Sequence, residues 1–241
     1  MGRLDDWRSF WDSDHSIYVN ARHKDVHYGD VADQIAAMVR CPAARVLDYG
    51  CGEAIHADRV ARKAARFVLS DSAPTVREAL STRFAGEPRI EVLSPEEVAK
   101  LPDADFDLIV ANSLVQYLTS GELDRLLVLW RRLLSPRGVL VVADVIPPTV
   151  GALSDVGALL RYAARHGFLF AALLGLAHSA TSGYGALRKQ LGLSQYTEAA
   201  FIEKLRAAGY SAERLPSNIE HNPARMTFRA RPVRTLAPTP C

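Results

Sequence analysis

Two hydrophobic periods alternate along the chain after residue 45. Short apolar runs rich in β-branched residues predict buried strands. These runs lie at residues 45–48, 67–70, 90–93, 107–111 and 139–144. Between them, apolar positions recur with the period of a helix, at about residues 54–63, 75–84 and 121–134. Strands that alternate with helices are typical of βαβ units, so the pattern predicts an α/β fold with a parallel sheet.

The last part of the chain departs from this alternation. A predicted helix at residues 198–208, ended by Gly209, is followed by two strands near residues 212–215 and 225–231. Two successive strands at this place favour an antiparallel addition to the parallel sheet. Residues 151–193 are too many for a simple connection, so we expect them to fold as a helical insertion over the carboxyl-terminal edge of the sheet.

The remaining segments flank this sheet. Residues 1–44 are expected to form a cap segment with a helix near residues 30–39. Residues 45–232 are expected to form one domain, because 241 residues, 49% of them hydrophobic, suffice for one substantial core. Residues 233–241 are expected to be a frayed, flexible tail.

Composition and charge exclude several classes of protein. The 29 basic and 27 acidic residues are spread along the chain, so the net charge of +2 gives no footprint of nucleic-acid binding. Cys41, Cys51 and Cys241 are odd in number and lack metal-ligand spacing, which favours neither a disulfide framework nor a zinc site and suits the cytoplasm. The first residues do not resemble a secretory signal, and the longest apolar run, residues 167–177, is too short to span a bilayer.

The stretch RVLDYGCGEA carries the strongest candidate chemistry. Asp48 ends the first predicted strand, and Gly50 and Gly52 form the turn after it, where the missing Cβ atoms let a ligand approach the backbone closely. Ile55 stands where the dinucleotide fingerprint needs a third glycine, and Asp48 and Glu53 would repel a pyrophosphate. The turn therefore favours a cationic ligand. The alternative is that Asp48 only caps the next helix and the glycines only make a tight turn.

This stretch resembles motif I of the class I S-adenosylmethionine-dependent methyltransferases, in which an acid precedes G-x-G. Asp71 ends the next predicted strand, at the position where nucleoside-binding sheets place an acid that accepts hydrogen bonds from ribose hydroxyls. Its alternative role is to cap the helix that opens at Ser72. The two roles are compatible with each other.

Three later stretches are similar to further motifs of the same family. EVLSPEEVAKLP places Glu97 at the family's adenine-contacting acid, although Ser94 and Pro95 replace the usual Gly-Asp, and an exposed helix-start glutamate is the alternative. DFDLIVANSLVQYL places Asn112 and Ser113 at the end of the fourth predicted strand. It lacks the D/N-P-P-Y form used on amino groups of bases and amides, which again disfavours nucleic acid. LLSPRGVLVVADVIPP resembles the family's L-x-P-G-G-x-L-x-x-x-D.

The resemblance spans about residues 45–144 and, weakly, the ending. It implies a seven-stranded, mostly parallel, doubly wound Rossmann-like sheet of order 3-2-1-4-5-7-6, with the helical insertion between strands five and six. It also implies the cofactor S-adenosyl-L-methionine, the product S-adenosyl-L-homocysteine, and in-line methyl transfer to a small acceptor. A hydrophobic acceptor is expected if the apolar insertion lines its pocket. The implied cofactor-binding residues are Asp48, Gly50, Cys51, Gly52, Asp71, Ser72, Glu97, Asn112 and Ser113.

A hydroxyl or protonated amine acceptor needs a base, and histidine titrates in the useful range. His23 and His27 are expected just before the first helix, in a segment that often folds over the cofactor in this family. His221 lies in the turn between the last two predicted strands. We expect His27 and His221 to be the catalytic candidates, ahead of His23 and His15. The alternative is that all four are ordinary surface or capping residues.

The insertion at residues 151–193 has several open roles. It is dense in apolar residues and flanked by the basic residues Arg161, Arg165, Arg188 and Lys189. It could line an acceptor pocket, form a dimer contact, lie on a membrane surface or simply be a core-packed helical pair. The oligomeric state stays open. Two rival functions remain, a non-catalytic module that binds the cofactor or a partner, and a nicotinamide-dependent oxidoreductase.

Overall fold

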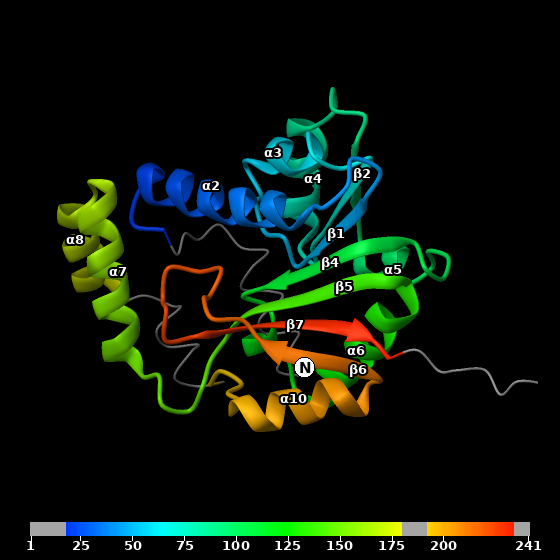
Figure 1. The fold of residues 1–241 in the computed structure, drawn as a ribbon. Coiled ribbons are helices and arrows are strands. Elements are labelled where there is room, and N and C mark those ends of the chain that lie inside the picture. Colours follow the sequence, from blue (N-terminus) through cyan, green and yellow to red (C-terminus); the bar gives the residue numbers. More distant parts are fainter. Residues whose placement is uncertain (1–17, 180–191, 234–241) are drawn as a thin grey trace, which may run out of the picture.

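The computed structural model describes residues 18–179 and 192–233. They form a seven-stranded sheet of order β3-β2-β1-β4-β5-β7-β6, which confirms the predicted order (Figure 1). The first five strands pair in parallel, and β7 pairs antiparallel with both β5 and β6. The strands are β1 (Arg45–Tyr49), β2 (Arg66–Ser70), β3 (Ile90–Leu93), β4 (Phe106–Asn112), β5 (Leu134–Val145), β6 (Tyr210–Arg214) and β7 (Met226–Pro232).

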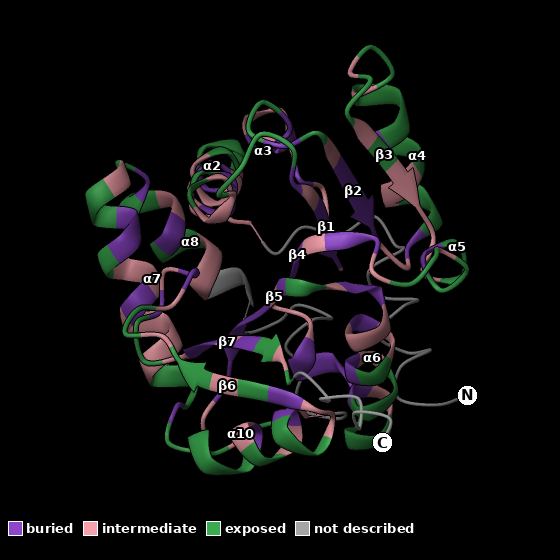
Figure 2. Cartoon of the chain, turned by 45° about the vertical axis from the view of Figure 1, so that its right-hand side comes forward, coloured by how far each residue is buried: buried purple, intermediate pink, exposed green. Residues whose placement is uncertain are grey.

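Helices cover both faces of this sheet. On one face lie α2 (Ala21–Met38), α3 (Ala57–Ala61) and α4 (Pro74–Arg83), and on the other lie α5 (Pro95–Val98), α6 (Ser120–Leu133) and α10 (Glu198–Ala207) (Figure 1). A short 3-10 helix, η1, covers Val115–Tyr117. Figure 2 shows the buried residues concentrated along the central strands and on the inner sides of the helices. The predicted doubly wound α/β fold is confirmed.

The first helix begins nine residues before the predicted start, so the expectation that His23 and His27 precede it is wrong. α2 opens at Ala21 because the side chain of Asn20 caps it, accepting a hydrogen bond of 2.8 Å from the backbone N–H of His23. The polar residues of its first turns hid the helical period. His23 is nevertheless buried, because the helical insertion packs against this end of α2.

The insertion contains two helices, α7 (Ala152–His166) and α8 (Leu169–Ser179). Gly167 ends α7 in the left-handed region with φ +77°, which lets the chain reverse within two residues. Tyr162, Phe168 and Ala172 pack with Val19 and Val26 of the segment around α2. Arg188 and Lys189 lie outside the described residues. In the part of the chain that the structure describes, none of the helices is long and apolar enough to cross a membrane.

Candidate functional site

The glycine turn after β1 is held in one conformation by the end of β2. Gly50 and Gly52 both have positive φ, +80° and +58°. The backbone N–H of Gly52 donates to Oδ2 of Asp71 at 3.0 Å, and that of Gly50 donates to the carbonyl of Ser70 at 2.7 Å. A Cβ atom on Gly52 would lie 2.8 Å from the hydroxyl oxygen of Tyr28. This turn therefore requires glycine at position 52 for conformation and for space.

Two carboxyl groups lie under the turn, of which Asp48 is buried and Asp71 is half-buried. Burial, followed by repulsion from Asp71, raises the pKa of Asp48 to about 7. Burial also raises the pKa of Asp71, although backbone N–H groups of Ala73 and Gly52 donate to it. Oδ1 of Asp48 is buried and has no hydrogen-bond partner within the described residues. An unsatisfied carboxyl oxygen beside a second carboxylate favours a cation at this place.

The raised pKa of Asp48 predicts a pH-dependent stability. The carboxyl has a pKa of about 7 in the folded protein and about 3.9 in the unfolded chain. The folded state holds more protons between these values, so the free energy of unfolding falls as the pH rises through this window. We expect Asp48→Asn to be more stable than the wild type by about 2 kcal/mol at about pH 8 and to show no advantage at about pH 4.

Urea denaturation at both pH values measures this difference. The matched control is Asp103→Asn, because the side chain of Asp103 is 77% exposed. The control should give the same difference from the wild type at both pH values. An Asp48→Asn protein that gains nothing at the higher pH would contradict the raised pKa of Asp48.

Tyr28 closes the turn from the side of α2. Its hydroxyl accepts a hydrogen bond of 3.0 Å from the backbone N–H of Glu53. Tyr28, Asp48 and Cys51 line a narrow cavity of about 20 Å³ beneath α2, enough for about one water molecule. A nucleoside is far larger than this cavity. A ligand of that size at the turn therefore lies outside this cavity.

The other predicted binding residues lie at the ends of neighbouring elements. Ser72 is half-buried beside Asp71. Glu97 is exposed and forms a capping box at the start of α5, where its carboxylate accepts a hydrogen bond of 2.7 Å from the backbone N–H of Ser94. Asn112 and Ser113 end β4, as the sequence predicts. Their contacts with a cofactor stay predictions.

A polar network joins the carboxyl ends of β4 and β5 to the β6–β7 connection. Ser113 donates to Oδ2 of Asp144 at 2.9 Å, and both residues have positive φ, 52° and 63°. Such left-handed non-glycine residues are uncommon and gather at functional sites. Arg225 forms ion pairs of 2.6 Å with Asp144 and 3.0 Å with Asp155, which tie β5 and α7 to β7.

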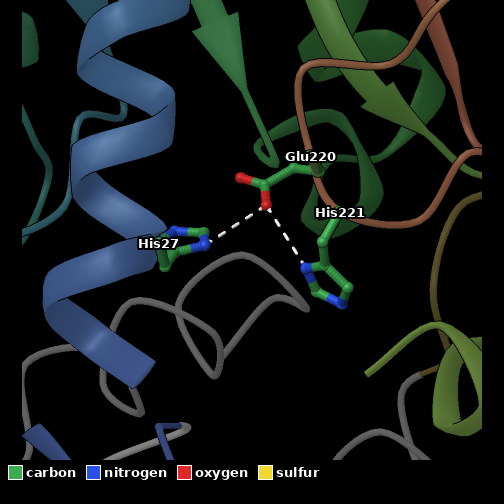
Figure 3. Close-up of side chains that lie close together, drawn as sticks. All are labelled: His27, Glu220 and His221. Carbon is green, nitrogen blue, oxygen red and sulfur yellow. Dashed lines mark ion pairs between the residues drawn. The ribbon is translucent and has the colours of Figure 1, made fainter. Parts of the chain in front are cut away.

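The predicted catalytic histidines meet at a residue that the sequence analysis missed. Nδ1 of His27, on α2, lies 3.3 Å from Oε2 of Glu220, and Nδ1 of His221 lies 3.7 Å from the same oxygen (Figure 3). Asn112 donates to the other oxygen of Glu220 at 2.7 Å. The ring of Tyr162 stacks on His221 with centroids 5.0 Å apart. We call His27, Glu220 and His221 the histidine cluster.

Electrostatics separate the roles within the histidine cluster. Burial lowers the pKa of His27, but the charge and hydrogen bond of Glu220, together with the charges of Asp144 and Asp30, outweigh it and raise the pKa above the ordinary value. Burial raises the pKa of Glu220, but His27, His221 and the hydrogen bond from Asn112 hold it well below the ordinary value. Glu220 is thus a buried carboxylate that stabilises protonated His27. A carboxylate beside a histidine is the arrangement of an oriented general base.

His23 does not join this cluster as a base. Burial, with repulsion from His27 and His221, lowers its pKa to about 4. Its ring stacks on Phe168 with centroids 4.8 Å apart. It therefore acts as a neutral packing residue. His15 lies outside the described residues.

The histidine cluster also has the donor types that divalent cations take. One ligand atom from each of its three residues lies within 4.8 Å of the others. The sequence spacing showed no such set because His27 is distant in the chain from the adjacent pair Glu220 and His221. The sequence did contain one signal. Glu220 and His221 are adjacent in a predicted turn, and an acid next to a histidine is a candidate pair of functional residues.

Comparisons with known proteins agree on the central part of the chain. A family model described as a methyltransferase domain matches residues 46–138. An uncharacterized methyltransferase of Mycobacterium tuberculosis is 34% identical over 128 residues, which are 52% of this chain and 61% of that protein. This central part of the chain is therefore similar to a methyltransferase domain. A ubiquinone biosynthesis O-methyltransferase of Xanthomonas campestris pv. campestris is 31% identical over 139 residues, 55% of this chain and 56% of that protein.

Solved structures share the fold of the methyltransferase domain. Phosphoethanolamine N-methyltransferase 1 of Haemonchus contortus, in complex with phosphoethanolamine and S-adenosylhomocysteine, aligns with a TM-score of 0.67 and 18% identity. The alignment covers 98% of this chain and 50% of that one. At this identity the likeness shows the fold alone. The chain spans about three fifths of the length of the mycobacterial relative it matches.

The matched segment divides the candidate residues into two groups. All of the predicted cofactor-binding residues lie within residues 46–138 of the methyltransferase domain. The histidine cluster and the helices α7 and α8 lie outside it. The glycine turn therefore lies in the part of the chain that the family model describes, and the histidine cluster does not.

Proposed function

We propose that this protein transfers a methyl group from S-adenosyl-L-methionine to a small hydrophobic acceptor, leaving S-adenosyl-L-homocysteine. The observation that carries the proposal is the buried, unpartnered oxygen of Asp48 under the glycine turn, beside the second carboxylate of Asp71. The cofactor carries an ammonium and a sulfonium group, and carboxylates stabilise such charges. A pyrophosphate ligand has the opposite charge, which counts against the nicotinamide alternative.

The residues present suit this cofactor. Gly50 and Gly52 make a tight turn in which a Cβ atom would crowd Leu114 and Tyr28, and Cys51 lies between them. Asp71, next to Ser72, has a second lone pair on each carboxylate oxygen for ribose hydroxyls. The remaining proposed contacts are those of Glu97, Asn112 and Ser113. The bound cofactor supplies an electrophilic methyl group, so the protein has mainly to align the acceptor and exclude water.

The proposed base for the acceptor is His27, with His221 as the second candidate. Because Nδ1 of His27 faces Glu220, Nε2 is the nitrogen left to take a proton from a hydroxyl or an ammonium. Glu220 stabilises the cation that results. Tyr162 and Phe168 bring the apolar helices α7 and α8 to the histidine cluster and to His23, which favours an apolar or amphipathic acceptor. The cysteine usage favours the cytoplasm as the place of action.

Calorimetry with S-adenosylhomocysteine, S-adenosylmethionine and NAD tests the proposed cofactor. We expect the two sulfur nucleosides to bind and NAD not to bind. Asp71→Ala should weaken S-adenosylhomocysteine binding about tenfold, because it removes the acceptor of charge-assisted hydrogen bonds. Asp103→Ala, which removes an exposed carboxylate, should leave the affinity unchanged. NAD binding in place of the sulfur nucleosides would refute the proposal.

A screen of cell extracts with radiolabelled S-adenosylmethionine tests catalysis and finds the acceptor. We expect label in an extractable small molecule. Cofactor binding without a labelled product in any extract would favour the rival function, a non-catalytic module.

A further inference from the structure

The outer face of α8 is apolar and exposed to solvent. We call Leu169, Phe170, Leu173 and Leu174 the α8 face; their exposed fractions are 40%, 75%, 51% and 58%. The spacing of these residues places them along one side of the helix. Contiguous exposed apolar side chains of this size mark interaction sites rather than ordinary surface.

The exposed charges of the helical hairpin formed by α7 and α8 have one sign. Arg161 and Arg165 of α7 are exposed, and Arg22 of α2 reaches the carbonyl of His166. Within the described residues of α7 and α8 the acid is Asp155, and it is neutralised by its ion pair with Arg225. An apolar helix face with a basic border is complementary to an anionic surface that also accepts apolar groups.

These features favour a bilayer over a second copy of the chain. A symmetric dimer contact places the same patch on both sides of the interface, so Arg161 and Arg165 would meet their own copies. With eleven residues, α8 is too short to span a bilayer, but it is long enough to lie in the headgroup region. We propose that the α8 face docks the protein on the surface of an anionic membrane.

The docking helices contact the candidate site directly. Phe168, which opens the turn into α8, stacks on His23, and Tyr162 of α7 stacks on His221. Docking would place the histidine cluster next to the bilayer, and the role of this cluster rests on the proposed function. The acceptor class that this favours is a membrane-dissolved molecule with a polar head to be methylated.

Vesicle sedimentation with the full chain tests the docking. The vesicles are phosphatidylcholine alone and phosphatidylcholine with phosphatidylglycerol. We expect binding to the anionic vesicles that weakens with added salt. Phe170→Ser with Leu174→Ser should lower the partition coefficient about a hundredfold, and Arg161→Gln with Arg165→Gln about tenfold. Val128→Ser is the matched control, because Val128 is an apolar residue of α6 that is 63% exposed, and it should bind like the wild type.

Three outcomes overturn the docking proposal. The first is the absence of binding to anionic vesicles. The second is that the Phe170→Ser, Leu174→Ser protein binds as well as the wild type does. The third is a wild-type dimer in sedimentation velocity that is lost in this double variant. Calorimetry with S-adenosylhomocysteine on the same proteins keeps the two proposals apart. Affinity for the nucleoside should be the same in all variants, so its loss in every protein would refute the proposed function and leave the vesicle result standing.

Discussion

Replacing Gly52 with valine is expected to lower the affinity for S-adenosylhomocysteine at least about a hundredfold. A β-branched residue is an outlier at the φ of +58° that this position holds. Its Cβ would also lie 2.8 Å from the hydroxyl oxygen of Tyr28. Both effects distort the turn whose backbone the cofactor is proposed to approach. Isothermal titration calorimetry measures the loss.

The matched control is Gly86→Val. Gly86 is exposed, and a Cβ atom built on it meets nothing within 4 Å. This variant should bind S-adenosylhomocysteine like the wild type, and circular dichroism should show both variants folded. A folded Gly52→Val protein that keeps tight binding would contradict the proposed role of the turn.

The second large effect is expected at the histidine cluster. His27→Ala should keep its affinity for S-adenosylhomocysteine and lose at least about a hundredfold in turnover, because a positioned base contributes at least that much. His221→Ala should also keep the affinity and slow turnover, by less. Turnover is measured with the acceptor that the extract screen identifies. Unchanged rates in both variants would remove the histidines from the mechanism.

Glu220→Gln tests how His27 is tuned. The carboxylate raises the pKa of His27, and the base works in its neutral form, so the wild-type rate should rise with pH through a raised pKa. Without that charge, burial lowers the pKa of His27, and the acid limb of kcat/KM should move to lower pH. Glu220→Asp should restore part of the wild-type profile. Glu213→Gln, on exposed β6, should leave it unchanged.

A chelator distinguishes the two uses of the histidine cluster. If the cluster accepts a proton, dialysis against EDTA should leave the wild-type rate and the pH profile unchanged. A rate lost on dialysis and restored by a divalent cation would instead assign the three donor atoms to a metal ion.

Local sequence patterns predicted the sheet and its glycine turn because these depend on neighbouring residues. The strands at 67–70 and 90–93 appear as apolar runs, and each lies within a residue of its observed bounds. Gly50 and Gly52 needed only their order in the chain to be found. The hydrogen bond between Gly52 and Asp71 likewise joins residues that successive parallel strands bring together.

The rest of the site depends on contacts that no local pattern contains. Glu220 becomes a partner of His27 only because the β6–β7 connection crosses to α2 at the carboxyl ends of the strands. The start of α2 was placed too late because its first turns are polar, and their burial depends on α7 and α8. Glu97 shows the opposite case, because its contacts are local. The capping box that engages its carboxylate involves only Ser94 and Glu97, which are close together in the sequence.

The adjacent positions of His27 and Tyr28 on α2 have a further consequence. Tyr28 contacts the glycine turn, while His27, the preceding residue of α2, contacts Glu220. A helix is stiff over so short a distance, so a displacement of α2 at the glycine turn would also be felt at Glu220. Substitutions that shift α2 are therefore expected to change nucleoside affinity and turnover together.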